Sequence, residues 1–383
     1  MVRPITRREF LRQSTAAGAS LTLLSVLGSS AAGAGAEAGA PPPLLLEALK
    51  LDDPVLPAEA ARLLGDLGSP AAVGPLVEYV RTSGYYAKTA GLDALGRLGD
   101  RRACGALREL ADDPRVDDDR GWWYGSTSVR LAASLALLAL GDDSRGEWLL
   151  DDDKSKTEID RKEWAMFCWF APAVLRLPDD LEATRRFKRR ITVEALTAHS
   201  REAHRFIHRC DALGLLRTPE AISVLVAMLG HASRYVRGRA AVNLLGASER
   251  PYHVDRVVWV AHNDPADFAR VKACEALARR GRHLYGRRLT AMFDTALVDP
   301  FDRAAAVDSL GRLGDASAVP LLARHTSNDD PYIRLCAVEA LERVGSPPAM
   351  AALRVRAGDE DLRVRMQVAK ATAADGRGGS NGQ

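Results

Sequence analysis

The stretch that decides the fold lies near the C-terminus and reads Asp330-Pro331-Tyr332-Ile333-Arg334-Leu335-Cys336-Ala337-Val338-Glu339-Ala340-Leu341-Glu342-Arg343-Val344-Gly345. Asp330 can accept hydrogen bonds from the first free backbone N–H groups of a helix, and Pro331 is tolerated at the first helical position. Gly345 suits the left-handed residue that ends a helix. Apolar residues recur between these signals at helical spacing: Ile333, Ala337, Ala340, Leu341 and Val344. The stretch therefore predicts one short amphipathic helix with both of its ends.

The same phrase recurs along the chain. Its arginine aligns with Arg237, Arg270, Arg303, Arg334 and Arg363, at separations of 33, 33, 31 and 29 residues. The glycine eleven residues after the arginine recurs as Gly281, Gly314 and Gly345. In the N-terminal half, Lys88 with Gly99 and Arg130 with Gly141 keep this offset, and Gly68 precedes Gly99 by 31 residues. A fixed period near this length indicates a solenoid of stacked repeats.

Each phrase is followed by a second short apolar segment. Three examples of its opening are 71–76, 221–225 and 318–322. One unit is thus a helix–turn–helix that buries its apolar face only when neighbouring units stack on it. The sequence predicts an all-α fold, an α-solenoid of repeats of about 31 residues.

The phrase resembles the HEAT-like repeats of the phycobilisome-lyase type. The resemblance rests on the residues of Asp330–Gly345, with Asp299–Gly314 and Asp264–Gly281 as close variants. It extends over most of residues 44–374, except the middle, and it implies the fold more than any function. We interpret the repeated Asp as a helix cap, and the repeated Arg as a bridge to the cap or carbonyl groups of the neighbouring repeat.

The first forty residues have a different character. The segment Thr6-Arg7-Arg8-Glu9-Phe10-Leu11-Arg12 resembles the twin-arginine export signal, and a weakly apolar stretch and small-residue cleavage sites follow it. The resemblance implies export across the bacterial cytoplasmic membrane to the periplasm or beyond. The apolar stretch is too short for a comfortable membrane span, so we expect no stable span once the signal is removed.

Charge and cysteine usage narrow the class of partner. The net charge is +3, and removing residues 1–40, with four Arg and two acidic residues, leaves 49 basic and 48 acidic residues. A general polyanion binder would be far more basic, so we expect no nucleic-acid partner. Five widely spaced cysteines do not predict a disulfide framework or a zinc site.

Residues 112–205 interrupt the repeat rhythm and hold five of the six tryptophans. Trp122, Trp123 and Tyr124 lie in an insert of about eleven residues and are candidates for binding a partner. The alternative is that they fill gaps where the regular repeat fails.

The densest basic run lies in the same region, in a segment with helical character. Its arginines form a second candidate binding surface for an acidic partner: Arg185, Arg186, Arg189 and Arg190. The alternative is an ordinary solvated helix face.

No motif for bond chemistry stands out. The sequence has no dinucleotide or phosphate-binding glycine motif, no nucleophile elbow and no Cys-x-x-Cys. Deoxyhypusine hydroxylase, an enzyme with HEAT-like repeats, holds iron with His-Glu pairs, and no such pair occurs here. We therefore predict no cofactor, no metal and no catalytic residue.

We divide the chain into a signal peptide (1–40), N-terminal repeats (44–111), an irregular region (112–205), C-terminal repeats (206–374) and a tail (375–383). The favoured function is an exported scaffold that binds a protein or another macromolecule through its extended surface, without catalysis. Two alternatives remain: an enzyme or cofactor-binding protein with its site in 112–209, and an assembly factor for an exported complex. The sequence does not define the partner or the oligomeric state.

Overall fold

The computed structural model describes residues 40–53, 55–113, 129–146, 171–172, 174–197, 203–295 and 299–378. Throughout these ranges the regular secondary structure is helical and contains no strand. The predicted all-α class is therefore confirmed. The chain divides into two compact units, residues 1–190 with 373–383 and residues 191–372. The proposed signal at 1–40 lies outside the described residues except for its last position.

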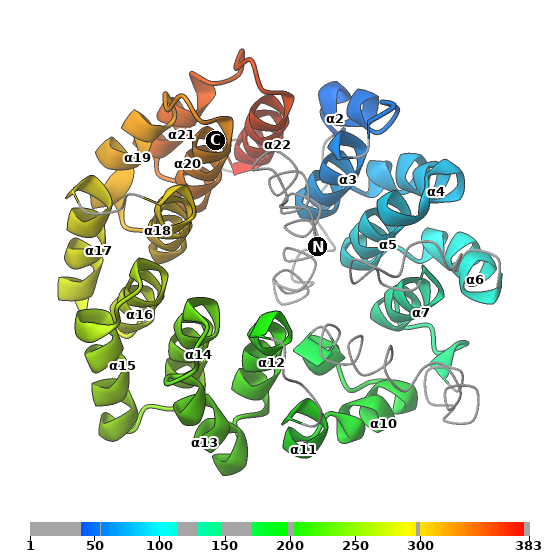
Figure 1. Ribbon diagram of the computed structural model, residues 1–383. Helices are drawn as coiled ribbons and strands as arrows, with labels where there is room; N and C mark the ends of the chain where they lie inside the picture. The colour runs from blue at the N-terminus through cyan, green and yellow to red at the C-terminus, as the bar shows by residue number, and fades with distance from the viewer. Residues whose placement is uncertain are drawn as a thin grey trace, which may run out of the picture. The chain divides into compact units, whose positions relative to one another are not determined.

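The first unit stacks its helices in two rows. α3, α5 and α7 pack side by side, while α4 contacts α5 and α6 contacts α7 (Figure 1). Short 3₁₀ turns at Pro70–Ala72 and Arg101–Ala103 lead into α4 and α6. The helices are α2 (Pro43–Ala48), α3 (Leu56–Leu67), α4 (Val73–Thr82), α5 (Tyr85–Leu98), α6 (Cys104–Asp112), α7 (Val129–Ala139) and α10 (Glu182–Arg190).

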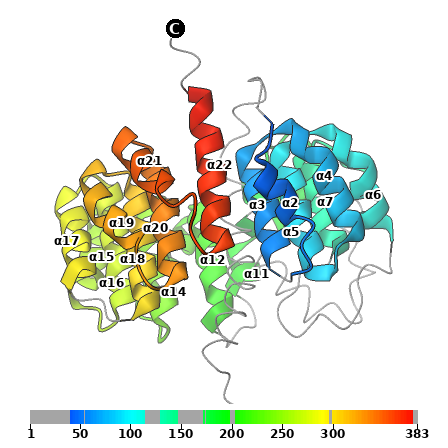
Figure 2. The same cartoon turned by 90° about the horizontal axis from the view of Figure 1, so that it is seen from above.

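The second unit repeats the arrangement with more copies. An even-numbered row runs from α12 through α14, α16 and α18 to α20, and the odd-numbered helices pack on one side of it (Figures 1 and 2). The helices are α11 (Val193–Thr197), α12 (Ala203–Leu216), α13 (Pro219–Met228), α14 (Arg234–Ala247), α15 (Pro251–Asn263), α16 (Asp267–Arg279), α17 (His283–Thr295), α18 (Pro300–Leu313), α19 (Val319–His325), α20 (Pro331–Val344) and α21 (Pro347–Arg354). Helix α22 (Leu362–Gly378) belongs to this unit up to residue 372.

Helix α20 begins and ends with the cap, proline and glycine that its sequence predicts. The Asp330 carboxylate accepts a 2.9 Å hydrogen bond from the Tyr332 N–H, and Pro331 begins the helix. Gly345 follows it with φ 64°. Of the five predicted core residues, Val344 is partly exposed and the other four are buried: Ile333, Ala337, Ala340 and Leu341.

The glycines that mark the repeat period have the backbone conformation expected at helix ends. All six of those predicted from the spacing lie in the left-handed region, with φ between 64° and 75°: Gly68, Gly99, Gly141, Gly281, Gly314 and Gly345. Residues with a Cβ rarely adopt this conformation, so each glycine ends one helix of the repeat.

Small residues set the spacing of the even-numbered row. A Cβ added at Gly311 in α18 would lie 2.6 Å from the Ala340 Cα of α20, closer than real Cβ atoms come. The backbones of these two helices therefore meet at a point where only glycine fits opposite alanine. This contact explains why the chain is rich in small residues.

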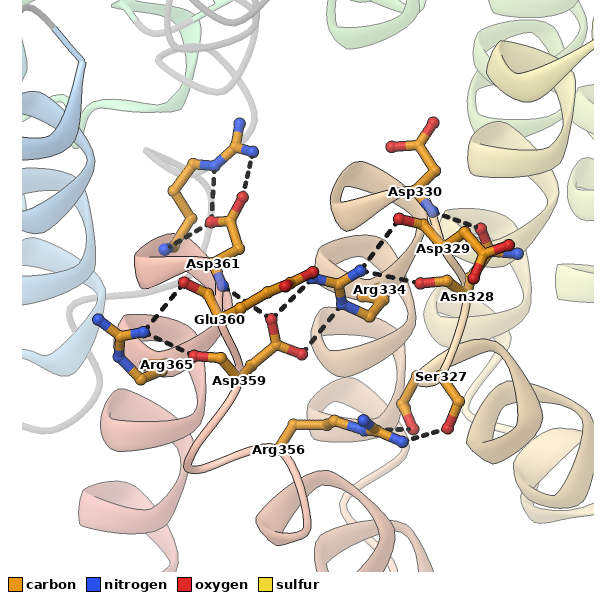
Figure 3. A network of polar contacts seen from close by, with 12 residues as sticks. Ser327, Asn328, Asp329, Asp330, Arg334, Arg356, Asp359, Glu360, Asp361 and Arg365 are labelled. Atoms are coloured by element: carbon orange, nitrogen blue, oxygen red, sulfur yellow. Dashed lines mark hydrogen bonds and ion pairs between the residues drawn. The ribbon is translucent and has the colours of Figure 1, made fainter.

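Charged side chains connect consecutive repeats, as the sequence predicts. Arg334 donates to both carboxylate oxygens of Asp359 at 3.0 and 2.9 Å, and to the carbonyl groups of Asn328 and Asp329 at 2.9 and 3.2 Å (Figure 3). Arg237 pairs in the same two-pronged way with Asp264, at 2.7 and 2.8 Å. Each bridge joins one helix to the loop of the following repeat.

One position of the repeat alignment was wrong. Arg365, and not Arg363, donates to the carbonyl groups of Asp359 and Glu360, six and five residues earlier, as Arg334 does to Asn328 and Asp329 (Figure 3). Arg363 instead bonds to Asp361 at the start of α22. Arg365 lies 31 residues after Arg334, so the period does not shorten at the last repeat.

A second polar cluster lies within the even-numbered row. The buried Lys272 ammonium donates to Glu275 at 2.9 Å and, across the helix interface, to Ser309 at 3.0 Å and Asp308 at 3.1 Å. Ser309 also donates to Glu275 at 2.8 Å. The cluster thus holds α16 against α18 while satisfying its own buried charges.

The described cysteines carry free thiols: Cys104, Cys210, Cys274 and Cys336. Cys210 and Cys274 are completely buried. Burial raises the pKa of Cys274 to about 11, so this thiol stays protonated near neutral pH. No helix in the described part of the chain has the length and apolar character to cross a membrane.

Candidate interaction surface

The structure describes only one of the two predicted candidate clusters. Trp122, Trp123 and Tyr124 lie in 114–128, outside the described residues. Arg185, Arg186, Arg189 and Arg190 lie on α10, in the first unit. The geometry of the candidate surface is therefore that of α10.

The sequence of α10 explains why it is helical and which side it buries. Glu182 stands in the first turn and basic residues fill the last turn, in the order that the helix dipole favours. Ala183 and Thr184 are buried, and Ala183 packs so closely on Gly146 that a Cβ there would lie 2.4 Å away. This contact attaches α10 to the turn that follows α7.

The four predicted arginines lie on the exposed side of this helix. Their positions, in two neighbouring pairs four residues apart, place them on adjacent stripes of one face. The side chains of Arg185 and Arg189 are 42% and 69% exposed. Helix α10 thus brings the predicted basic residues together on a solvent-facing surface.

Acidic residues of the same segment partly balance this charge. Arg185 donates to Glu182 at 2.9 Å, and Arg189 reaches the same carboxylate at 3.3 Å. Lys188 bonds to Asp179 at 2.8 Å. The hydrogen bond from Arg185 lowers the pKa of Glu182, and that from Lys188 lowers the pKa of Asp179. Residues 179–190 hold five basic and three acidic side chains, so the segment keeps a net charge of +2.

The chemistry available to this surface is recognition. Guanidinium groups stay charged at every physiological pH and bind carboxylates through paired N–H donors. Among the described residues, no group of three or more His, Cys, Asp and Glu side chains is arranged to hold a metal ion.

Two exposed aromatic residues were missed by the sequence analysis. Tyr252 and Trp259 on α15 are 60% and 58% exposed. Their spacing of seven residues, two helical turns, was the available signal. Buried positions of the same helix, such as Val257 and Val260, show which side packs inward.

The comparisons with known proteins concern the repeats. A family model of HEAT repeats matches residues 42–124 and 296–373. Phycocyanobilin lyase subunit alpha from Picosynechococcus sp. is 45% identical to the chain over 51 residues, which are 13% of this chain and 19% of that protein. The match thus spans about a fifth of that relative.

Two solved structures resemble the chain at low identity. Human deoxyhypusine hydroxylase in complex with glycerol is 18% identical, with 96% of this chain and 98% of that chain covered and a TM-score of 0.30. The complex of CpcE and CpcF of phycocyanin lyase from Nostoc sp. PCC7120 is 20% identical, with 90% and 98% covered and a TM-score of 0.29. At these TM-scores neither structure indicates what this chain binds.

The helical rows, the repeat period and the family match together define the class. The chain is an all-α, solenoid-like repeat scaffold. The repeats at 42–124 and 296–373 match the HEAT-repeat family model, and a 51-residue stretch is similar to a phycocyanobilin lyase subunit.

Proposed function

We propose that this chain is an exported HEAT-repeat scaffold that binds a protein partner through its extended surface and performs no bond chemistry. The observation that supports it most is the exposed arginine face of α10, where four guanidinium groups point to solvent on one short helix. Most other charged positions that the repeats share are occupied in joining helices, as Arg237 and Arg334 are. Arg185 and Arg189 pair with Glu182, but their side chains stay 42% and 69% exposed and can still contact a partner.

The nearly balanced charge of the chain favours a protein over a nucleic acid as that partner. With 53 basic and 50 acidic residues, the chain lacks the broad basic surface that a general polyanion binder needs. A local cluster of exposed arginines can instead pair with carboxylates of a protein surface, where Arg is enriched at binding sites. Repeat arrays typically bind partners in this way, through many side chains on an extended surface.

The binding test is a pull-down from envelope extract with the mature chain as bait. We expect the double variant Arg185→Glu/Arg189→Glu to lose a partner that the wild type captures, because it reverses two charges on the proposed face. Arg81→Glu is the control, since Arg81 is 51% exposed on α4, far from α10 in sequence. Equal capture by all three proteins would contradict a role for α10.

The insert containing Trp122 and Trp123 allows a second test. Replacing both residues with Ala should weaken partner binding while leaving the melting temperature nearly unchanged. A large drop in melting temperature would instead mean that they are core residues.

The enzyme alternative with its site in 112–209 has a different test. It is favoured if no partner is captured and metal analysis of the protein purified after export finds a stoichiometric ion.

Export by the twin-arginine route has its own test. Changing Arg7 and Arg8 to Lys together keeps their charge and removes the paired guanidinium groups of the proposed signal. We expect the variant to remain in the cytoplasmic fraction in full-length form, whereas the wild type is shortened and found in the envelope or medium. Export of the variant at the wild-type rate would refute the proposed signal.

A further inference from the structure

The side of α15 that faces away from the even-numbered row carries two large aromatic residues. Tyr252 and Trp259 are exposed there, seven residues apart and hence on one stripe of the helix. Arg256 lies between them on the same stripe and is also exposed. The opposite side of α15 packs against α16 and buries His253 together with three apolar residues: Val257, Val260 and Ala261.

The N-terminal turn of α17 lies next to the C-terminal turn of α15. The His262 Nε2 and Tyr285 Oη atoms are 3.3 Å apart, and the two rings cross edge to face at 5.7 Å. Trp259 precedes His262 by one turn, and Leu284, which is 62% exposed, precedes Tyr285. The contact between His262 and Tyr285 therefore joins the turn of α15 that follows Trp259 to the turn of α17 that contains Leu284.

The surroundings of these apolar side chains are basic. Four exposed arginines flank them, and within the described part of the chain no carboxylate is paired with their guanidinium groups: Arg250, Arg256, Arg282 and Arg287. Asp255 is the single acidic residue of α15. The nearby Glu249 is already paired with Arg280. The local charge is thus clearly positive, in contrast to the near-neutral chain as a whole.

Packing of the repeats does not require large apolar side chains at these solvent-facing positions. Among the described residues, six large apolar side chains are strongly exposed, and three of them lie here. The solvent-facing positions of the neighbouring α13 carry small side chains such as Ser223 and Ala227. An apolar patch bordered by charge on an otherwise polar surface marks an interaction site.

We propose that the α15–α17 surface, defined as Tyr252, Arg256, Trp259, Leu284 and Arg287, binds an acidic protein segment that also carries apolar side chains. The unpaired guanidinium groups complement carboxylates, and Trp259 and Leu284 supply the apolar contact that a purely charged ligand would not use. Trp, Tyr and Arg are the residue types that contribute most to binding at protein interfaces. The inference rests on the proposed scaffold function, but not on the α10 face.

The test uses the full mature chain and a fluorescein-labelled peptide in which Phe and Leu are spaced among glutamates. We expect saturable binding by fluorescence anisotropy, weakened about tenfold or more by Trp259→Ala and by Arg256→Glu. Arg256→Lys should retain part of the affinity because it keeps the charge. Val355→Ala is the matched control, since Val355 is 73% exposed elsewhere in the same unit and should not affect binding.

Four results would overturn the inference, the last of them with the Arg185→Glu/Arg189→Glu variant. One is unchanged affinity in a folded Trp259→Ala variant. Another is equal binding of an all-glutamate peptide, which would leave no role for the apolar residues. The third is tighter, Trp259-dependent binding of oligothymidylate, which would make the surface a nucleic-acid site.

The Arg185→Glu/Arg189→Glu variant separates the two surfaces. If it alone loses the peptide, the peptide binds α10, which supports the proposed function and refutes the α15–α17 surface.

Discussion

At the scale of single residues, burial decides how much an ion pair contributes. The side chains of Arg334 and Asp359 are 6% and 3% exposed and share two hydrogen bonds. Those of Arg81 and Glu109, which also connect two repeats, are 51% and 64% exposed. Removing one member of a buried pair leaves its partner charged and poorly solvated, whereas water replaces the partner of an exposed group.

Arg334→Ala should therefore lower the free energy of unfolding by about 3 kcal/mol, while Arg81→Ala changes it by less than about 1 kcal/mol. Arg334→Lys should fall between the wild type and Arg334→Ala, because lysine keeps the charge and loses the two-pronged geometry. Denaturant unfolding of the purified mature chain measures all three. Similar losses of unfolding free energy in Arg334→Ala and Arg81→Ala would show that the buried bridge between repeats contributes little beyond the charge of its arginine.

Asp93 on α5 couples stability to pH. Burial raises the pKa of its carboxyl to about 6, although the 2.8 Å ion pair with Arg97 opposes the shift. An unfolded aspartate titrates near about 3.9, so the folded state binds the proton more readily over the interval between the two values. Ionisation of Asp93 thus costs stability as the pH rises through this interval, and acidification recovers it.

Asp93→Asn cannot ionise, so its stability relative to the wild type should depend on pH. Subtracting the wild-type free energy of unfolding from that of the variant should give a difference that is largest at neutral pH and falls by up to about 3 kcal/mol toward pH 4. The difference between asparagine and a protonated aspartate adds a pH-independent offset, so only the change of this free-energy difference with pH is compared. Parallel stability curves for the two proteins over this range would contradict the raised pKa.

At the scale of the helix, glycines serve two different purposes that the sequence alone does not separate. Gly311 lies in α18 where it meets the backbone of α20, and a Cβ there would lie 2.6 Å from the Ala340 Cα. Gly105 lies on the exposed side of α6, with no heavy atom of a neighbour within 4 Å of an added Cβ. Both are helical, so the same substitution tests packing at one position and backbone entropy at the other.

Gly311→Ala should destabilise the protein by about 1–3 kcal/mol, because the two helices must separate to admit the methyl group. Gly105→Ala should stabilise it by about 0.4–1 kcal/mol, because alanine loses less conformational freedom in a helix. Thermal unfolding with a common reference buffer compares them. A stabilised Gly311→Ala variant would mean that α18 and α20 can shift apart without loss.

Sequence patterns predicted what is local to a helix and missed what depends on neighbours. The cap at Asp330 and the six left-handed glycines follow from residue types at a fixed spacing. The alignment error at Arg363 arose because α22 begins Leu362-Arg363-Val364-Arg365, where two arginines lie two residues apart and only the carbonyl contacts distinguish them. The exposure of Trp259 was not predicted, because helical period shows that residues share a face but not whether that face meets solvent.

At the scale of the whole molecule, contacts in a repeat array run mainly between adjacent units. The bridges from Arg237 to Asp264 and from Arg334 to Asp359 span 27 and 25 residues, and each connects a repeat only to the following one. A perturbation in one repeat should therefore weaken its neighbours first.

Hydrogen exchange measured by mass spectrometry can follow this decay. In the Gly311→Ala variant, amides of α18 and α20 should exchange faster than in the wild type, while those of α3 and α5 in the first unit keep their rates. Gly105→Ala serves as the control, with no acceleration in α18 or α20. Uniformly faster exchange across both units would show that the chain unfolds as one cooperative block.

Bridging arginines such as Arg237 and Arg334 also limit how such a chain can change in evolution. The arginine and its aspartate belong to successive repeats, so copying or deleting one complete period preserves every pairing, while a gain or loss of part of a period breaks one. The length of the array can therefore grow or shrink by unequal recombination in steps of about thirty-one residues.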